Sequence, residues 1–420
     1  MRRIPGGRTA WFVAGGGALV VAIGAGIGAF GLINGWFDDA SVEGSTVGFD
    51  IAAEPAAPPA APEWPEYGFT PERTRANTGL KLSPPYRRLW RVDAGSLVEF
   101  PPVIAQGRAY VGTNGRRALA IDLRTGRVVW RARLHGAVAS SPAATGPIGR
   151  ARHRLLLVTM VKGGLIALDP ATGRTLWRMS FGSPIESSPL VLGDQVYVGT
   201  LDGRVLRISL RTRRVVWTAR ATGAVKGSLA RSGRNVVVGD YGGRVTAYRQ
   251  DTGRVVWRTT SPGQRLRGAG RFYAGPTIAY GRVFIGNVNG RMLALSAARG
   301  SVAWVRVVDD FIYSSAAVAR RTVFVGSYDH HLYALDAVTG RVKWRHDGGE
   351  RISGSPTVVG DIVWYSTIAP RAEDGRTFGL DLRTGRVVVR INEGRYTPAV
   401  AVKGTLLLTG VDTITALRSR

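Results

Sequence analysis

The sequence predicts an all-β protein, an eight-bladed β-propeller of four-stranded antiparallel blades, and three observations indicate it. Tryptophans recur 40 or 47 residues apart over most of the chain. Most of them end one repeated phrase, written LAIDLRTGRVVW in one copy and YALDAVTGRVKW in another. Each copy alternates β-branched and aromatic residues between Gly and Asp turns, as short strands do. A strand-rich period of about forty residues is typical of propellers. The repeated tryptophans are Trp90, Trp130, Trp177, Trp217, Trp257, Trp304 and Trp344.

The unit that ends at Trp344 shows the four strands expected of each blade. The alternation predicts strands at Ser314–Ala319, Thr322–Ser327 and His331–Asp336, followed by a fourth that carries Trp344. The Thr339-Gly340 step supplies the positive φ that a tight turn needs, and the Asp before it can accept turn N–H groups. These residues are therefore interpreted first as structural.

The number of blades follows from the fourth strand. Its position falls at the seven tryptophans and once more at Val389. The unit that contains Trp90 has only its fourth strand, and the unit after Val389 has only its first three strands. The N-terminal strand is therefore expected to complete the last blade, which closes the ring and removes its free edges. A seven-bladed ring is the alternative.

The N-terminus predicts the compartment. Residues 10–37 carry no charge and are long enough to cross a bilayer as a helix. Arginines precede this stretch and acidic residues follow it, which predicts a single pass with the N-terminus inside and the propeller extracytoplasmic. A cleaved signal peptide is the alternative. The expected parts are a cytoplasmic basic tail (1–9), a transmembrane anchor (10–37), a Pro/Ala-rich linker and lead-in (38–84) and the propeller (85–420).

Charge and cysteine content narrow the chemistry. The chain has 57 Lys and Arg against 29 Asp and Glu, a net charge of +28, which favours an anionic membrane or cell-wall polymer as a partner. Nucleic acid is not expected, because the propeller is predicted outside the cytoplasm and its cations lie in turns. Cysteine is absent, so disulfides and thiolate metal sites are excluded.

Four-stranded blades have two unlike faces. The Thr-Gly face carries the Asp-x-x-Thr-Gly-Arg turns and the first-to-second-strand turns, whereas the loop face carries the blade-to-blade loops. Strand direction places the tether on the Thr-Gly face, whose arginines are expected to face an anionic surface; solubilising turn chemistry is the alternative. These arginines are Arg127, Arg174, Arg214, Arg254, Arg341 and Arg386.

The loop face is the better place for a ligand or a partner. The residue three positions before each strand-start proline begins an innermost strand near the axis, so charged and aromatic side chains converge on one mouth. These residues are Glu99, Ala139, Glu186, Tyr273, Ser353 and Arg395, with Lys226 and Tyr313 where the proline is lost. Two long insertions, Ser261–Phe272 with Arg265 and Arg267, and Ser366–Thr377, add loops on the same face. The alternative is a cluster that only seals a wet channel.

The A-L-D-x-x-T-G-x-x-x-W phrase, the S-S-P strand starts and the G-x-x-D-G turns resemble the quinoprotein-type, PQQ-like propeller repeat over about residues 64–420. Trp64-Pro-Glu-Tyr-Gly-Phe and Arg73-Thr-Arg-Ala-Asn77 are similar to the opening of such propellers. The resemblance implies that the tryptophans dock neighbouring blades. The family that the chain resembles includes PQQ-dependent alcohol dehydrogenases and the non-catalytic outer-membrane assembly lipoprotein BamB.

The expected function is a membrane-anchored, monomeric scaffold or binding module in the cell envelope, similar to BamB but without its lipobox cysteine. It is not expected to be an enzyme or to hold a cofactor or metal. A PQQ-dependent dehydrogenase, with Glu99 and Glu186 as Ca²⁺ ligands, is the alternative. The adjacent-cysteine disulfide typical of that branch cannot form in this chain.

Overall fold

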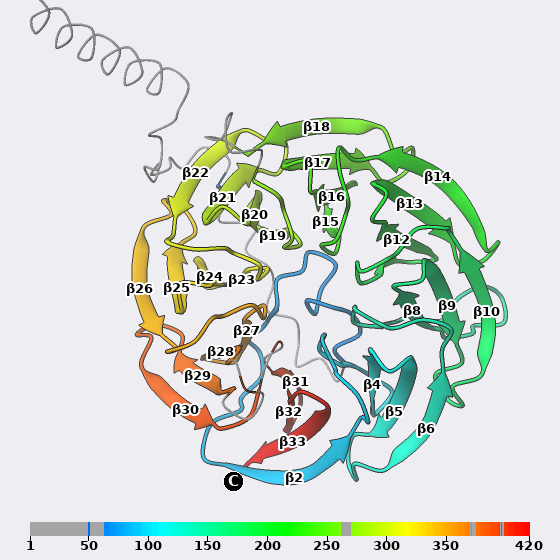
Figure 1. Ribbon diagram of the computed structural model, residues 1–420, viewed down its shortest axis with the longest axis horizontal. Coiled ribbons are helices and arrows are strands. Elements are labelled where there is room, and N and C mark those ends of the chain that lie inside the picture. The colour runs from blue at the N-terminus through cyan, green and yellow to red at the C-terminus, as the bar shows by residue number, and fades with distance from the viewer. Residues whose placement is uncertain are drawn as a thin grey trace, which may run out of the picture.

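Eight sheets stand around one axis in the computed structural model (Figure 1). The structure describes residues 49–50, 63–261, 270–369, 371, 375–394, 396 and 399–420. No helix among these residues is long and apolar enough to cross a membrane, and the predicted anchor at residues 10–37 lies outside them.

The blades, named A to H in chain order, each run from an innermost to an outermost strand. Blade A comprises β3 (Val103–Ala105), β4 (Arg108–Thr113), β5 (Arg117–Asp122) and β6 (Val128–Arg133). Blade B comprises β7 (Ala143–Ala144), β8 (Leu156–Met160), β9 (Gly164–Leu168) and β10 (Thr175–Ser180). Blade C comprises β11 (Leu190–Leu192), β12 (Gln195–Gly199), β13 (Arg204–Ser209) and β14 (Arg214–Arg220). Blade D comprises β15 (Ala230–Ser232), β16 (Asn235–Gly239), β17 (Arg244–Arg249) and β18 (Val255–Thr260).

The second half of the ring repeats this order. Blade E comprises β19 (Thr277–Ala279), β20 (Arg282–Gly286), β21 (Arg291–Ser296) and β22 (Val302–Val307). Blade F comprises β23 (Ala317–Ala319), β24 (Thr322–Gly326), β25 (His331–Asp336) and β26 (Val342–Asp347). Blade G comprises β27 (Thr357–Val359), β28 (Ile362–Ser366), β29 (Thr377–Asp381) and β30 (Val387–Ile391). Blade H comprises β31 (Val400–Val402), β32 (Thr405–Thr409) and β33 (Thr413–Ser419), and β2 (Tyr86–Asp93) is its fourth strand.

The predicted eight blades and the predicted closure are confirmed. Strand β2 pairs antiparallel with β33, with Trp90 opposite Ala416, so the first complete strand zips the last blade shut (Figure 1). In blade F the first strand is shorter than predicted. The Ser315 N–H donates to Ser355 Oγ of the next blade at 2.9 Å, so it does not join the ladder of its own sheet.

A tryptophan on the outer strand of one blade packs against the Thr-Gly turn of the next. Trp304 is fully buried, and its indole N–H donates to the Ala337 carbonyl at 3.1 Å. Gly340 has φ +76°, and a Cβ there would lie 2.7 Å from the Trp304 ring, so only glycine permits this approach. The same pairing joins Trp90 to Gly126, Trp130 to Gly173, Trp217 to Gly253, Trp257 to Gly300 and Trp344 to Gly385.

The junction between blades B and C differs. Arg213, at φ +57°, stands where the other turns have glycine. Trp177 is half-buried, and within the described part of the chain its indole has no hydrogen bond. The other irregular turn, Arg299-Gly300, keeps the usual packing, because Trp257 Nε1 donates to Ala297 O at 3.0 Å.

The lead-in before β2 fills the centre of the ring. Residues 64–80, here called the arm, run around the axis beside the innermost strands and appear as the blue segment at the centre of Figure 1. Its β1 (Ala76–Asn77) pairs parallel with β27. Inner strands of successive blades donate N–H groups to arm carbonyls: Ile104 to Trp64, Ala144 to Pro65, Arg231 to Pro71, Ile278 to Glu72, Val318 to Thr74 and Val358 to Arg75. The arm therefore bonds one blade after another, which fixes its path through the propeller.

Candidate functional site

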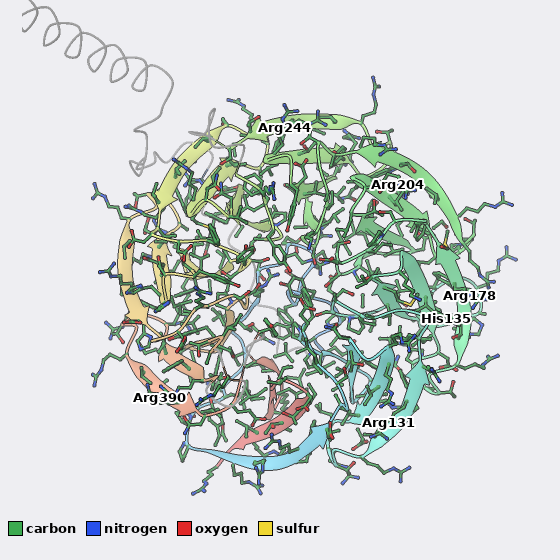
Figure 2. All side chains as sticks on the ribbon, in the orientation of Figure 1. Arg131, His135, Arg178, Arg204, Arg244 and Arg390 are labelled. Atoms are coloured by element: carbon green, nitrogen blue, oxygen red, sulfur yellow. The ribbon has the colours of Figure 1, made fainter. Side chains whose placement is uncertain are left out.

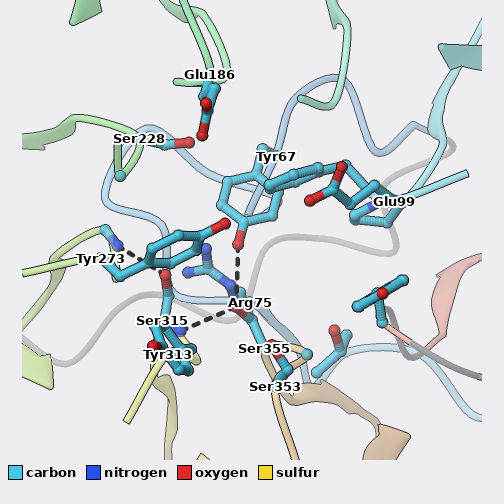
Figure 3. A pocket seen from close by; sticks show the side chains of 18 of the residues that line it. Tyr67, Arg75, Glu99, Glu186, Ser228, Tyr273, Tyr313, Ser315, Ser353 and Ser355 are labelled. Atoms are coloured by element: carbon cyan, nitrogen blue, oxygen red, sulfur yellow. Dashed lines mark hydrogen bonds between the residues drawn. The ribbon is translucent and has the colours of Figure 1, made fainter. Parts of the chain in front are cut away.

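A pocket opens on the loop face at the propeller axis, with the arm as its floor (Figure 3). The pocket has a cavity volume of about 70 Å³, and the whole depression, counted with the solvent-filled space at its mouth, encloses about 810 Å³. Tyr67, Gly68 and Arg75 of the arm line it from below. Figure 3 shows Glu99 and Glu186 on two sides of the pocket, with Tyr67 between them.

Six side chains that the sequence aligned on the strand-start proline line this pocket, although they come from different blades. They are Glu99, Glu186, Lys226, Tyr273, Tyr313 and Ser353. Ala139 is half-buried outside the lining. Arg265, Arg267 and Arg395 lie outside the described residues.

Charge in the pocket is paired at Lys226. Its Nζ lies 2.9 Å from Glu186 Oε2 and also packs over the rings of Tyr273, at 5.3 Å, and Tyr241, at 5.7 Å. Burial raises the pKa of the Tyr241 hydroxyl to about 12. Burial also raises the pKa of the Tyr273 hydroxyl, and the Glu99 and Glu186 carboxylates raise it further. Both tyrosines therefore stay protonated and can donate hydrogen bonds.

Glu99 is the second carboxyl of the pocket. Burial raises the pKa of Glu99, the hydrogen bond from Asn114 at 3.5 Å lowers it, and Glu186 raises it. Since its pKa lies above the ordinary value, Glu99 takes up a proton more readily than an exposed glutamate.

Aromatic rings extend from the pocket across blades D, E and F. Tyr273 and Tyr313 meet edge to face at 5.0 Å, and Tyr313 lies 4.8 Å from Tyr328. Phe311, 44% exposed, packs against Tyr313 at 5.8 Å. Tyr241, Tyr273, Tyr313, Tyr328 and Phe311 form an unbroken row, here called the aromatic ridge. Arg271 lies over Tyr241 and Arg351 over Tyr328, at 5.9 and 5.6 Å.

Sequence reasoning missed the floor of the pocket. Arg73 is fully buried in the arm, where Nη1 bonds Glu66 at 2.9 Å, Nε donates to Leu229 O at 2.9 Å and Nη2 donates to Pro189 O at 3.0 Å. Tyr67 donates or accepts a hydrogen bond with Ser355 Oγ at 3.0 Å. The two arginines of the Arg73-Thr-Arg75 stretch were the available signal, since buried cations need a partner.

The S-S-P strand starts have a structural role around the pocket. The second serine of each motif accepts the backbone N–H of the equivalent residue in the previous blade. Ser141 N donates to Ser188 Oγ at 3.0 Å, and Ser188 N to Ser228 Oγ at 3.1 Å. These bonds hold neighbouring strand starts in register, so the pocket residues three positions from the proline stay in place.

The Thr-Gly face is more uniform. Its six predicted arginines are all exposed and spread around the ring, and Figure 2 shows further basic side chains, Arg131, Arg178 and Arg390, along the outer strands. At the B–C junction a groove of about 470 Å³ is lined by Trp177 and basic side chains. Those cations are Arg150, Arg174, Arg211 and Arg213. Within its turns, Asp122 accepts the Thr125 hydroxyl at 2.7 Å and the Thr125 N–H, which lowers the pKa of Asp122.

Two observations bear on the metal and quinone cofactor that the dehydrogenase alternative requires. Glu186 is already paired with the Lys226 ammonium, which opposes a divalent cation there. No group of three or more His, Asp or Glu able to hold a metal occurs in the part of the chain that the structure describes.

Comparisons with known proteins agree with this architecture. No curated protein matches the sequence. Among solved structures, BamB from Moraxella catarrhalis is 18% identical, with a TM-score of 0.63 over 80% of this chain and all of that one. A europium-containing methanol dehydrogenase is 14% identical, with a TM-score of 0.71 over 85% of this chain and 98% of that one. Quinohemoprotein alcohol dehydrogenase from Comamonas testosteroni is 15% identical, with a TM-score of 0.71 over 86% of this chain and 81% of that one.

Sequence identities this low show only a shared fold, because proteins with different names and roles can have the same fold. A family model gives a closer assignment. The model described as outer membrane protein assembly factor BamB matches residues 82–149, 143–314 and 309–417, which together span almost the whole ring. The chain therefore belongs to this BamB family of PQQ-like repeat propellers.

Proposed function

We propose that this chain is a membrane-anchored scaffold that binds a partner protein outside the cytoplasmic membrane, on its loop face. The observation that carries the proposal is the aromatic ridge. Protein interfaces are enriched in tyrosine, phenylalanine and arginine, and their strongest anchors are aromatic side chains in the centre of the contact. The ridge joins five such rings, flanked by Arg271 and Arg351, beside a pocket at the axis.

The position of the tether supports the choice of face. Phe49 and Asp50 are the described residues nearest in sequence to the predicted anchor. Phe49 stacks on Tyr280 at 5.1 Å, and the Asp50 N–H donates to the Tyr280 carbonyl at 2.9 Å. Tyr280 lies in the turn between β19 and β20, on the Thr-Gly face. A tether on that face would turn the loop face away from the membrane and toward partners.

The exposed arginines fit the same arrangement. A basic side chain near an anionic membrane contributes about 1 kcal/mol of binding free energy. We propose that the Thr-Gly face rests against anionic lipid or wall polymer, while the ridge contacts the partner. The fold of the dehydrogenase neighbours is shared, but the pairing of Glu186 with Lys226 favours binding over catalysis.

A pull-down of tagged full-length protein from native membranes tests the scaffold proposal. We expect specific envelope proteins with the wild-type chain, and at least a tenfold loss in the Phe311→Ala/Tyr313→Ala double variant. Val216→Ala is the matched control, because Val216 is 49% exposed on the outer strand β14, away from the ridge. If the wild-type chain, the double variant and the Val216→Ala control recover the same amount of partner protein, the aromatic ridge does not bind the partner.

Two further measurements separate the scaffold from its alternatives. Titration with PQQ and Ca²⁺ is expected to give neither saturable uptake nor dye reduction; if both appear, the chain is a dehydrogenase. Reporter fusions at the C-terminus are expected to be active only outside the cytoplasm. A cytoplasmic C-terminus would contradict the anchored, extracytoplasmic arrangement.

A further inference from the structure

Arg75 is a buried cation without a counter-ion. Its side chain is 2% exposed, yet among the described ion pairs none includes Arg75. Nη1 donates to the Arg73 carbonyl at 2.9 Å, whereas Nη2 is buried and has no hydrogen-bond partner among the described residues. The neighbouring Arg73 uses the Glu66 carboxylate, so this carboxylate does not compensate Arg75.

An arrangement of this kind is unfavourable when the site is empty. Burying a charge costs much free energy unless it is paired, and an unsatisfied guanidinium N–H adds to that cost. The cost is recovered if an anion enters beside Arg75. The pocket allows such an entry, because Arg75 lines its floor and its mouth opens on the loop face.

The surroundings of Arg75 specify the anion. Its guanidinium lies 4.3 Å from the centre of the Tyr67 ring, which fixes the plane of the fork. Burial raises the pKa of the Tyr67 hydroxyl, but the Arg75 charge and the hydrogen bonds from Ser355, Arg75 and Ser315 together outweigh burial and bring that pKa below its ordinary value. The hydroxyls of Tyr67, Ser353 and Ser355 offer further hydrogen bonds in the same pocket.

Size and charge favour a carboxylate over a phosphate. The cavity, about 70 Å³, has room for a planar group of a few atoms. Glu99 and Glu186 line the same pocket, and their charges oppose a dianion more than a monoanion. A guanidinium fork matches the two oxygens of a carboxylate.

We propose that the central pocket binds a single carboxylate group at Arg75, supplied by an acidic side chain or the C-terminus of a partner protein. The inference rests on the proposed scaffold function for the source of the carboxylate. Tyr313 and Lys226 line the same pocket, so a carboxylate bound at Arg75 would extend the contact that begins on the aromatic ridge.

Acetate is the direct probe of the site, and acetamide is its neutral isostere. Saturation-transfer NMR on the full-length chain in detergent measures binding of each at constant ionic strength. We expect transfer to acetate, and at least tenfold weaker transfer to acetamide. Arg75→Gln should lower acetate binding at least tenfold, because a hydrogen bond to a charged group is lost. Arg390→Gln, on the exposed outer strand β30, is the matched control and should bind as wild type.

Two variants guard against a general folding defect. Arg75→Lys keeps the charge but loses the fork, and Tyr67→Phe loses only the hydroxyl. Both are expected to bind acetate more weakly than wild type and more strongly than Arg75→Gln. The proposal is overturned if acetate and acetamide bind equally, or if folded Arg75→Gln binds acetate like the wild type.

Partner capture distinguishes this inference from the scaffold proposal. If acetate releases a captured partner and Arg75→Gln fails to capture it, the carboxylate belongs to the partner. Acetate binding without any captured protein would refute the scaffold and leave a site for a small free carboxylate. Capture that is unaffected by both acetate and Arg75→Gln would refute the partner carboxylate and leave the scaffold intact.

Discussion

The two faces of this propeller are built from the same repeat but use it in opposite ways. On the Thr-Gly face six blades present a Gly under a tryptophan, and four of them also present an Asp that caps the turn and an exposed Arg after it. On the loop face the equivalent positions differ from blade to blade, with Glu99, Glu186, Lys226 and Tyr273 meeting at one pocket.

The difference separates what the repeat needs from what it leaves variable. A residue that docks two blades must recur, because every junction has the same geometry. A residue at the mouth of the ring docks no blade, so it can differ from one blade to the next, as the Glu186–Lys226 pair does. Variation within a repeat is therefore the better guide to a binding site, and the constant positions indicate stability.

The largest expected effect separates a buried arginine of the arm from an exposed arginine of the Thr-Gly face. Arg73→Met should lower the free energy of unfolding by about 3–5 kcal/mol, because it leaves Glu66 as an unpaired buried charge and frees the carbonyls of Tyr67, Pro189 and Leu229. Arg174→Met, at an exposed turn, should change it by about 0.5 kcal/mol or less. Denaturant unfolding measures both. Equal effects would mean that the arm does not hold the ring.

The next effect compares two tryptophans of the same repeat position. Trp304→Ala should cost about 3–5 kcal/mol of unfolding free energy, since the indole is fully buried and hydrogen-bonded. Trp177→Ala should cost about 2 kcal/mol less, because Trp177 is half-buried and faces Arg213 rather than glycine. Thermal and denaturant unfolding of the two variants check the difference. If Trp177→Ala is as costly, the open groove at the B–C junction does not weaken docking.

These residues also show how far the sequence alone could lead. The Trp-to-Trp spacing, the lone strand around Trp90 and the three strands after Val389 predicted the blade number and the closure, because one strand and three strands together complete a four-stranded blade. The S-S-P alignment brought Glu99, Glu186 and Tyr273 together, because equal positions in equal strands meet at the axis. The arm could not be placed, since residues 64–80 have no period and their bonds reach blades far along the chain.

A membrane-binding measurement sharpens the contrast between the faces. In a chain of residues 38–420, Arg174→Gln/Arg211→Gln should weaken binding to vesicles rich in anionic lipid by about 30-fold at low salt, since each charge contributes about 1 kcal/mol. Arg271→Gln/Arg351→Gln removes two charges from the loop face and is the matched control, expected to bind as wild type. Salt should abolish the difference. Equal losses in both double variants would mean that net charge, and not one face, directs binding.

The smallest expected effect concerns the turn of the Thr-Gly face in which arginine replaces glycine. Arg213 adopts φ +57°, a conformation that costs an L-residue free energy and that glycine adopts without strain. Arg213→Gly should therefore raise the free energy of unfolding by about 1 kcal/mol or less, because relief of backbone strain is partly offset by the flexibility that glycine adds to the unfolded chain. It should also let the turn approach Trp177 as Gly340 approaches Trp304, which a blue shift of tryptophan fluorescence would report. Arg211→Gly, two residues earlier at an exposed position without positive φ, should be neutral or destabilising. If Arg213→Gly destabilises the protein, the arginine stabilises the B–C junction through its own side chain, and the groove is a built feature of the Thr-Gly face rather than a lapse of the repeat.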